Sequence, residues 1–141
     1  MSVFIDANIF IAFANKRDRD HTRSSELINM VRKGELGLPY TSDYVFDEAV
    51  TAALVRTKRP DIAIKTGKII LGSREESIPS LARLVMVDER IFAKAWTTFK
   101  AGRFVDLSFT DHTILAQLKE LKIDTLISFD TNFDGLTTRI S

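Results

Sequence analysis

The chain lacks cysteine altogether and has only three prolines, six glycines and two histidines among its 141 residues. The absence of cysteine excludes disulfides, zinc–thiolate sites and thiol chemistry. The scattered glycines form no phosphate-binding loop. No apolar run approaches the roughly 20 residues of a membrane-spanning helix, and the N-terminus has no basic segment like that of a signal peptide. We therefore expect a cytoplasmic protein with no membrane segment.

The remaining composition is that of an ordinary globular protein. Hydrophobic residues make up 45% of the chain, which suffices for a real core. No repeat, low-complexity tract or flexible linker interrupts the sequence, so we predict a single domain over residues 1–141. Twenty basic residues nearly balance 19 acidic ones, giving a net charge of +1.

Strand and helix patterns alternate along the chain. The patterns predict strands at 3–5, 37–41, 84–87, 125–129 and, at a sheet edge, 136–140, and helices at 20–33, 44–57, 60–71, 88–100 and 109–122. Residues 7–14 fit a strand or a helix equally well. Strands alternating with helices indicate an α/β fold, a three-layer α/β/α sandwich with a mainly parallel central sheet.

Two carboxylates come at the ends of predicted strands. Asp6 closes the apolar run before it, and Asp130 closes the strand near the C-terminus. Ligand sites in parallel sheets form at the carboxyl ends of the strands, so neighbouring strands would bring both side chains to one rim. Asp after a strand is also a common turn or helix-capping residue. Asn8 could orient Asp6, hold a metal-bound water or make a local turn.

Two further carboxylates lie within predicted helices. Asp111 sits in the middle of an apolar helix face, and the pattern Ser108-x-x-Asp111 also matches a capping box. Glu48 lies at the edge of its helix's apolar arc, where it would either reach out to solvent or face an enclosed site. Asp47 falls on the opposite, solvated side of the same helix.

Several carboxylates directed at one place raise one another's pKa unless a cation holds them ionised. Mg²⁺ or Mn²⁺ suits such an all-oxygen set. Setting the four candidates aside leaves 15 acids against 20 bases, an excess of 20 − 15 = +5 that could form a basic rim for a polyanion or simply an ordinary solvated surface. The histidines, His21 and His112, have no serine or cysteine partner in a nucleophile motif. We expect His112 at the surface and Trp96 in the core.

Four segments resemble the acidic motifs of the PIN domain family, which includes the VapC ribonuclease toxins. They are VFIDANIFIA at 3–12, YVFDEAV at 44–50, LSFTDHTILA at 107–116 and IDTLISFDTNF at 123–133. Their order and spacing match the family over essentially the whole chain. His112 stands where a small residue such as alanine is more common.

The resemblance implies a metal-dependent endoribonuclease acting on single-stranded RNA. The family's acidic positions, which bind Mg²⁺ or Mn²⁺ and catalyse hydrolysis, would be Asp6, Glu48, Asp111 and Asp130, with Asn8 and Ser108 as supporting polar positions. Toxin-type relatives pair with a small antitoxin protein and commonly form homodimers. The alternative is a catalytically silent PIN-like scaffold or binding partner in RNA processing. An aspartyl-phosphate mechanism is disfavoured because the first motif has Asn8 where a second aspartate would be needed.

Overall fold

The computed structural model describes all 141 residues, Met1 to Ser141. Its strands are β1 (Ser2–Ile5), β2 (Leu38–Ser42), β3 (Arg83–Val85), β4 (Thr125–Ile127) and β5 (Arg139–Ile140). Its helices are α1 (Ala7–Ala14), α2 (His21–Arg32), α3 (Asp43–Thr57), α4 (Pro60–Leu71), α5 (Glu89–Lys100) and α6 (Phe109–Glu120), with a 3₁₀ turn η1 (Thr131–Phe133).

The five strands form one sheet in the order β3-β2-β1-β4-β5, and every neighbouring pair is parallel. The first strand is therefore central, with β2 on one side and β4 on the other. From β1 the chain adds β2 and β3 toward one edge of the sheet, and it then crosses back to add β4 and β5 on the other side of β1. The direction of the strand order therefore switches between β1 and β4. In parallel sheets such a switch point is where ligands bind.

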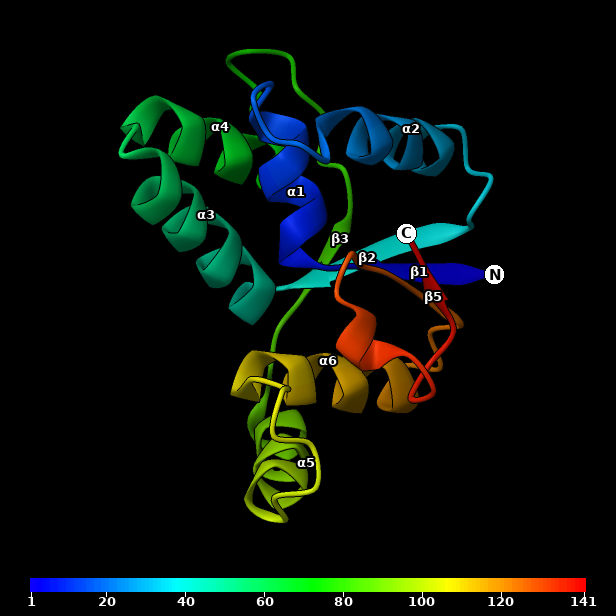
Figure 1. Ribbon diagram of the computed structural model, residues 1–141. Coiled ribbons are helices and arrows are strands. Elements are labelled where there is room, and N and C mark those ends of the chain that lie inside the picture. Colours follow the sequence, from blue (N-terminus) through cyan, green and yellow to red (C-terminus); the bar gives the residue numbers. More distant parts are fainter.

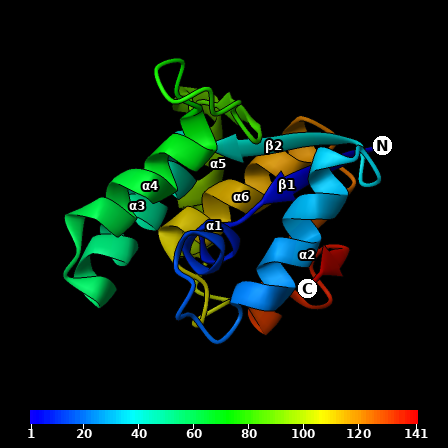
Figure 2. The same ribbon diagram turned by 90° about the horizontal axis from the view of Figure 1, so that it is seen from above.

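Helices cover both faces of the sheet (Figure 1). On one face α1 packs against α2, α3 and α4, and on the other α5 packs against α6. Figure 2 looks onto the face covered by α1 to α4, with α6 beyond the strands. The predicted three-layer α/β/α sandwich with a parallel sheet is confirmed. No helix is both long and apolar enough to cross a membrane.

The central strand is buried on both faces, because Val3, Phe4 and Ile5 are completely inaccessible to solvent. The segment that follows, left open by its periodicity, is a helix. Asp6 ends the strand and caps α1 by accepting a hydrogen bond from the backbone amide of Ala7. One residue therefore makes the strand-to-helix turn and fixes where its own carboxylate lies.

The predicted strand at 84–87 differs from the observed one. β3 spans Arg83–Val85, is only partly covered, and is followed by the exposed Met86. The apolar run suggested a strand buried on both faces, but β3 lies at the edge of the sheet, where burial is incomplete. At the opposite edge, β5 is two residues long, shorter than the predicted 136–140.

Candidate active site

The topology brings the four predicted carboxylates to one edge of the sheet. Asp6 follows β1 and Asp130 follows β4, and these strands are neighbours. Glu48 lies near the start of α3, which leaves the carboxyl end of β2 directly. Asp111 is in the first turn of α6, whose chain leads back into β4. Because a helix between parallel strands runs against them, its N-terminus lies at the strands' carboxyl ends.

Asp6 is almost fully buried, with 4% of its surface exposed. Its Oδ1 accepts from the backbone amide of Ala7 at 2.7 Å, and its Oδ2 accepts from the Ser128 hydroxyl at 2.6 Å. Burial raises the pKa of Asp6 to about 6, against the effect of these hydrogen bonds, and the charges of Asp111 and Asp130 raise it further. The carboxylate is therefore held rigidly where a negative charge is disfavoured.

The Ser128 hydroxyl links three of these groups. It donates to Asp6 and accepts from the Asn8 side-chain amide at 3.2 Å and from the backbone amide of Asp130 at 3.0 Å. A hydroxyl offers one donor and two acceptor positions, so its capacity is fully used. The sequence prediction did not include Ser128. The available signal was a polar residue between Ile127 and Phe129, two positions before Asp130.

Asn8 orients its neighbours. Its Oδ1 accepts from the backbone amide of Phe129 at 3.1 Å, and its Nδ2 donates to Ser128 and, at 3.4 Å, to Asp6. These contacts tie the first turn of α1 to the segment after β4. Of the roles considered for Asn8, the contacts match orientation of the Asp6 carboxylate.

Glu48 carries the least satisfied polar atom of the cluster. Its Oε2 is buried and has no hydrogen-bond partner. Burial raises the pKa of Glu48 to about 7, and the charges of Asp6 and Asp111 add to this effect, whereas Arg56 opposes it. Of the two predicted possibilities, Glu48 faces the enclosed site. Asp47, as expected, is exposed.

Asp111 serves as a helix cap and faces the site at the same time. The predicted capping box is present: the Ser108 amide donates to Asp111 Oδ2 at 2.9 Å, and the Asp111 amide donates to Ser108 Oγ at 3.1 Å. Asp111 is nevertheless 8% exposed, and burial raises its pKa, as does the charge of Asp130. Ser108 thus fixes the orientation of Asp111.

Asp130 is partly exposed, as is Glu48, whereas Asp6 and Asp111 are buried. Its Oδ1 accepts from the backbone amide of Asn132 at 2.9 Å and caps η1. Asp134, a few residues later, instead pairs with Arg139 at 2.6 Å at the surface. Asp130 is therefore the loop acid that belongs to the cluster, and Asp134 is a surface residue.

The donor set is composed of oxygen atoms and suits a hard divalent cation. The buried, unpartnered Oε2 of Glu48 and the mutual repulsion of Asp6, Asp111 and Asp130 both fit a site that binds positive charge. As the side chains lie, no three acidic or histidine side chains are grouped closely enough to hold one ion. Binding of one ion would therefore require carboxylates to move toward one another.

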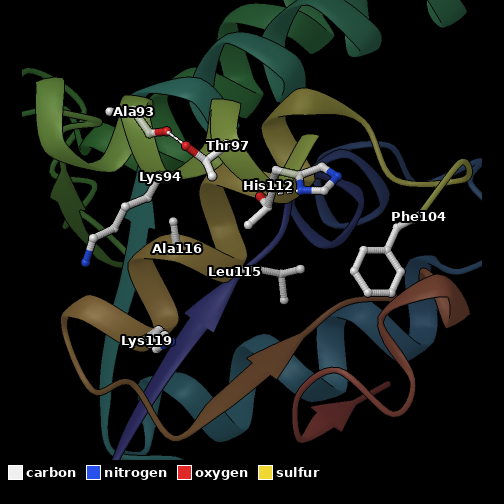
Figure 3. A pocket seen from close by; sticks show the side chains of 9 residues that line it. Ala93, Lys94, Thr97, Phe104, His112, Leu115, Ala116 and Lys119 are labelled. Carbon is white, nitrogen blue, oxygen red and sulfur yellow. Dashed lines mark hydrogen bonds between the residues drawn. The ribbon is translucent and has the colours of Figure 1, made fainter. Parts of the chain in front are cut away.

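Two expectations about aromatic residues were wrong. His112, expected at the surface, is 2% exposed; its Nδ1 lies 2.8 Å from the Thr98 hydroxyl, and its ring helps to line a cavity of about 500 Å³ between α5 and α6 (Figure 3). Trp96, expected in the core, is 48% exposed on α5. The helix pair buries the His112 ring against Phe99 and leaves Trp96 on the outer side.

The PIN domain family model matches residues 3–137, so this chain belongs to the PIN domain family. Among solved structures, VapC20 of Mycobacterium tuberculosis, described as a sarcin-ricin loop cleaving toxin, superposes with a TM-score of 0.76 at 22% identity over 93% of this chain and 92% of that one.

Two further solved structures share the fold. VapBC2 of Rickettsia felis, solved with a promoter DNA fragment, gives a TM-score of 0.65 at 13% identity, covering 99% of this chain and 98% of that one. FitAcB of Neisseria gonorrhoeae gives 0.64 at 15% identity, covering 99% and 96%. A search of curated proteins found no significant match.

Proposed function

We propose that this protein is a divalent-metal-dependent endoribonuclease that cleaves single-stranded RNA, and that it is the toxin of a VapBC-type toxin–antitoxin pair. The observation that carries the proposal is the cluster of four carboxylates at the switch point, with the pKa of Asp6, Glu48 and Asp111 raised and a buried Glu48 oxygen without a partner. A protein gains nothing in stability from such a cluster, so its presence supports a cation-binding role.

The residues have distinct roles in this proposal. Asp6 and Asp111 would hold the Mg²⁺ or Mn²⁺ ion, because both are nearly buried and fixed by hydrogen bonds. Glu48 would contact the ion directly or through a water molecule, and Asp130 would complete the set of carboxylates around it. A bound divalent ion lowers the pKa of water and neutralises charge on the phosphate. Asn8, Ser108 and Ser128 keep the carboxylates in place.

Two exposed apolar surfaces support the proposed protein partners, a homodimer and a small antitoxin. Helix α5 exposes Phe92, Trp96 and Phe99 to between 41% and 48%. A second pocket, of about 440 Å³, lies between α3 and α4 and is lined by exposed apolar residues such as Leu54 and Ile64. Exposed clusters of this kind commonly mark protein interfaces.

The decisive experiment compares wild-type protein with Asp111→Asn on a pool of labelled single-stranded RNAs, with Mg²⁺ or Mn²⁺ and with EDTA. We expect metal-dependent cleavage that EDTA abolishes and that Asp111→Asn lowers by about three orders of magnitude, since it removes one charge that holds the ion. Asparagine can still accept the Ser108 hydrogen bond, so circular dichroism should show an unchanged fold. Calorimetry with Mn²⁺ measures ion binding separately. A folded wild-type protein that neither binds the ion nor cleaves RNA would favour the scaffold interpretation.

A further inference from the structure

Arg56 is an exposed arginine beside the carboxylate cluster. It lies in the last turn of α3, eight residues after Glu48, and its charge opposes the rise in the pKa of that glutamate. It lines an open pocket of about 380 Å³ together with Asn8, Phe129 and Asp130. Residues 18–20, in the loop after α1, also line it. The pocket is therefore continuous with the candidate active site.

Arg56 has no acidic partner, whereas Arg19, Arg59 and Arg139 each have one. Arg19 pairs with Asp20, and Arg139 pairs with Asp134 at 2.6 Å. Arg59, three residues after Arg56, forks onto Asp61 with hydrogen bonds of 3.2 and 2.6 Å. The Arg56 guanidinium makes no ion pair within 4.0 Å, although Asp18, Asp20 and Asp130 line the same pocket. Its donors are free for a ligand.

An RNA strand approaching this edge meets four carboxylates, which repel its phosphates. A guanidinium next to them supplies the attraction that the carboxylates lack, and its planar fork matches two phosphate oxygens. We propose that Arg56 is a substrate-positioning residue that binds an RNA phosphate flanking the scissile one. This inference rests on the proposed nuclease function, but RNA binding tests it separately from cleavage.

Arg56 could instead act only as a counter-charge that keeps Glu48 ionised. The two roles predict different measurements. A counter-charge affects ion affinity and leaves RNA affinity unchanged. A phosphate ligand affects RNA affinity and its dependence on salt, because each phosphate contact displaces counterions from the strand.

The experiment measures binding of a fluorescently labelled, mixed-sequence single-stranded RNA by anisotropy in the cleavage-deficient Asp111→Asn protein, over a range of salt concentrations. Arg56→Gln should raise the Kd roughly fivefold to tenfold, the effect of losing one charge-assisted contact at an exposed position. The slope of log Kd against log salt should fall by about 0.7, the value for one phosphate on a single strand. Arg56→Lys keeps the charge and should keep the slope.

Arg59→Gln is the matched control. It removes the same charge at a position three residues after Arg56, from an arginine that is already paired with Asp61. It should change neither the Kd nor the slope. Equal effects of Arg56→Gln and Arg59→Gln would overturn the inference, as would unchanged RNA affinity accompanied by weaker Mn²⁺ binding in calorimetry. An Asp111→Asn protein that binds no RNA would also overturn it. A third outcome separates the two proposals: RNA binds to the protein with Arg56 intact, Arg56→Gln weakens this binding, and the wild type does not cleave RNA. That outcome would contradict the nuclease function and leave the role of Arg56 in RNA binding supported.

Discussion

The acids of this protein fall into two groups that differ in how their charge is compensated. On the outer surface, Asp61, Glu120 and Asp134 each hydrogen-bond to a basic side chain, which lowers their pKa. At the carboxyl edge of the sheet, Asp6 and Glu48 are held by hydroxyl and amide groups or by nothing at all, and burial raises their pKa.

The two groups of acids contribute differently to the free energy of unfolding. A surface ion pair contributes little to stability and costs little to break. A buried carboxylate without a cation destabilises the ionised protein, so these carboxylates lower the stability of the protein, and a bound cation would offset that cost. The four predictions below test this difference.

Ser128→Ala should disrupt the buried hydrogen bonds that hold the carboxylates at the edge of the sheet. The change removes a buried hydroxyl that donates to Asp6 and accepts from Asn8 and the Asp130 amide. We expect about 2–3 kcal/mol lower free energy of unfolding, because several buried polar groups lose their partner. Chemical denaturation measures it, with Ser25→Ala, a partly exposed serine on α2, as control. If Ser128→Ala lowered the free energy of unfolding no more than Ser25→Ala does, the hydrogen bonds of Ser128 would not contribute to stability.

The metal-free protein should become less stable as pH rises. Burial raises the pKa of Asp6 from 3.8 to about 6 and that of Glu48 from 4.5 to about 7, so the native state holds protons that the unfolded chain releases. Stability conferred by these groups is therefore complete below about pH 4 and declines up to about pH 7.

Glu48→Gln should remove part of this decline and stabilise the metal-free protein at pH 8 by about 1 kcal/mol, after allowance for solvent screening of a half-buried group. Thermal unfolding across the pH range, with and without Mg²⁺, measures the effect. The ion should stabilise wild type above pH 7 more than the variant. A variant less stable than wild type at pH 8 in EDTA would contradict the electrostatic interpretation of Glu48.

Asp61→Asn should have the smallest effect and leave the free energy of unfolding close to that of wild type at all pH values above 5, because Asp61 and its partner Arg59 are both solvated. Ion binding and RNA cleavage should be unchanged. Calorimetry with Mn²⁺ and the cleavage assay check this. An effect as large as that of Glu48→Gln would remove the distinction between the two groups of acids.

Much of this arrangement could be predicted from the sequence. The strand end before Asp6 and the capping box at Ser108 are local patterns and were predicted correctly. The predicted strand at 125–129 ends at Ile127, so Asp130 follows β4 after two further residues, at the expected edge of the sheet. The buried apolar run at Val3–Ile5 correctly indicated a strand inside a parallel sheet. Such features depend only on a few neighbouring residues, so the sequence carries them directly.

Other features depend on contacts between distant segments. Ser128 meets Asp6 and Asn8 across about 120 positions of the chain, and no local pattern distinguishes it from an ordinary strand serine. His112 is buried because α5 packs against α6, and Trp96 is exposed because it faces away from that pair. Helix periodicity indicates an apolar face but does not determine which partner covers it.

The order of the strands also governs when the site can exist during synthesis. The central strand β1, which is followed by Asp6, leaves the ribosome before its neighbour β4, which positions Asp130 and Ser128. A growing chain therefore has no complete carboxylate set until β4 and Asp130 have emerged. A fragment that ends before β4 lacks both the strand that pairs with β1 and the hydroxyl that fixes Asp6, so we expect such a fragment to form no complete site.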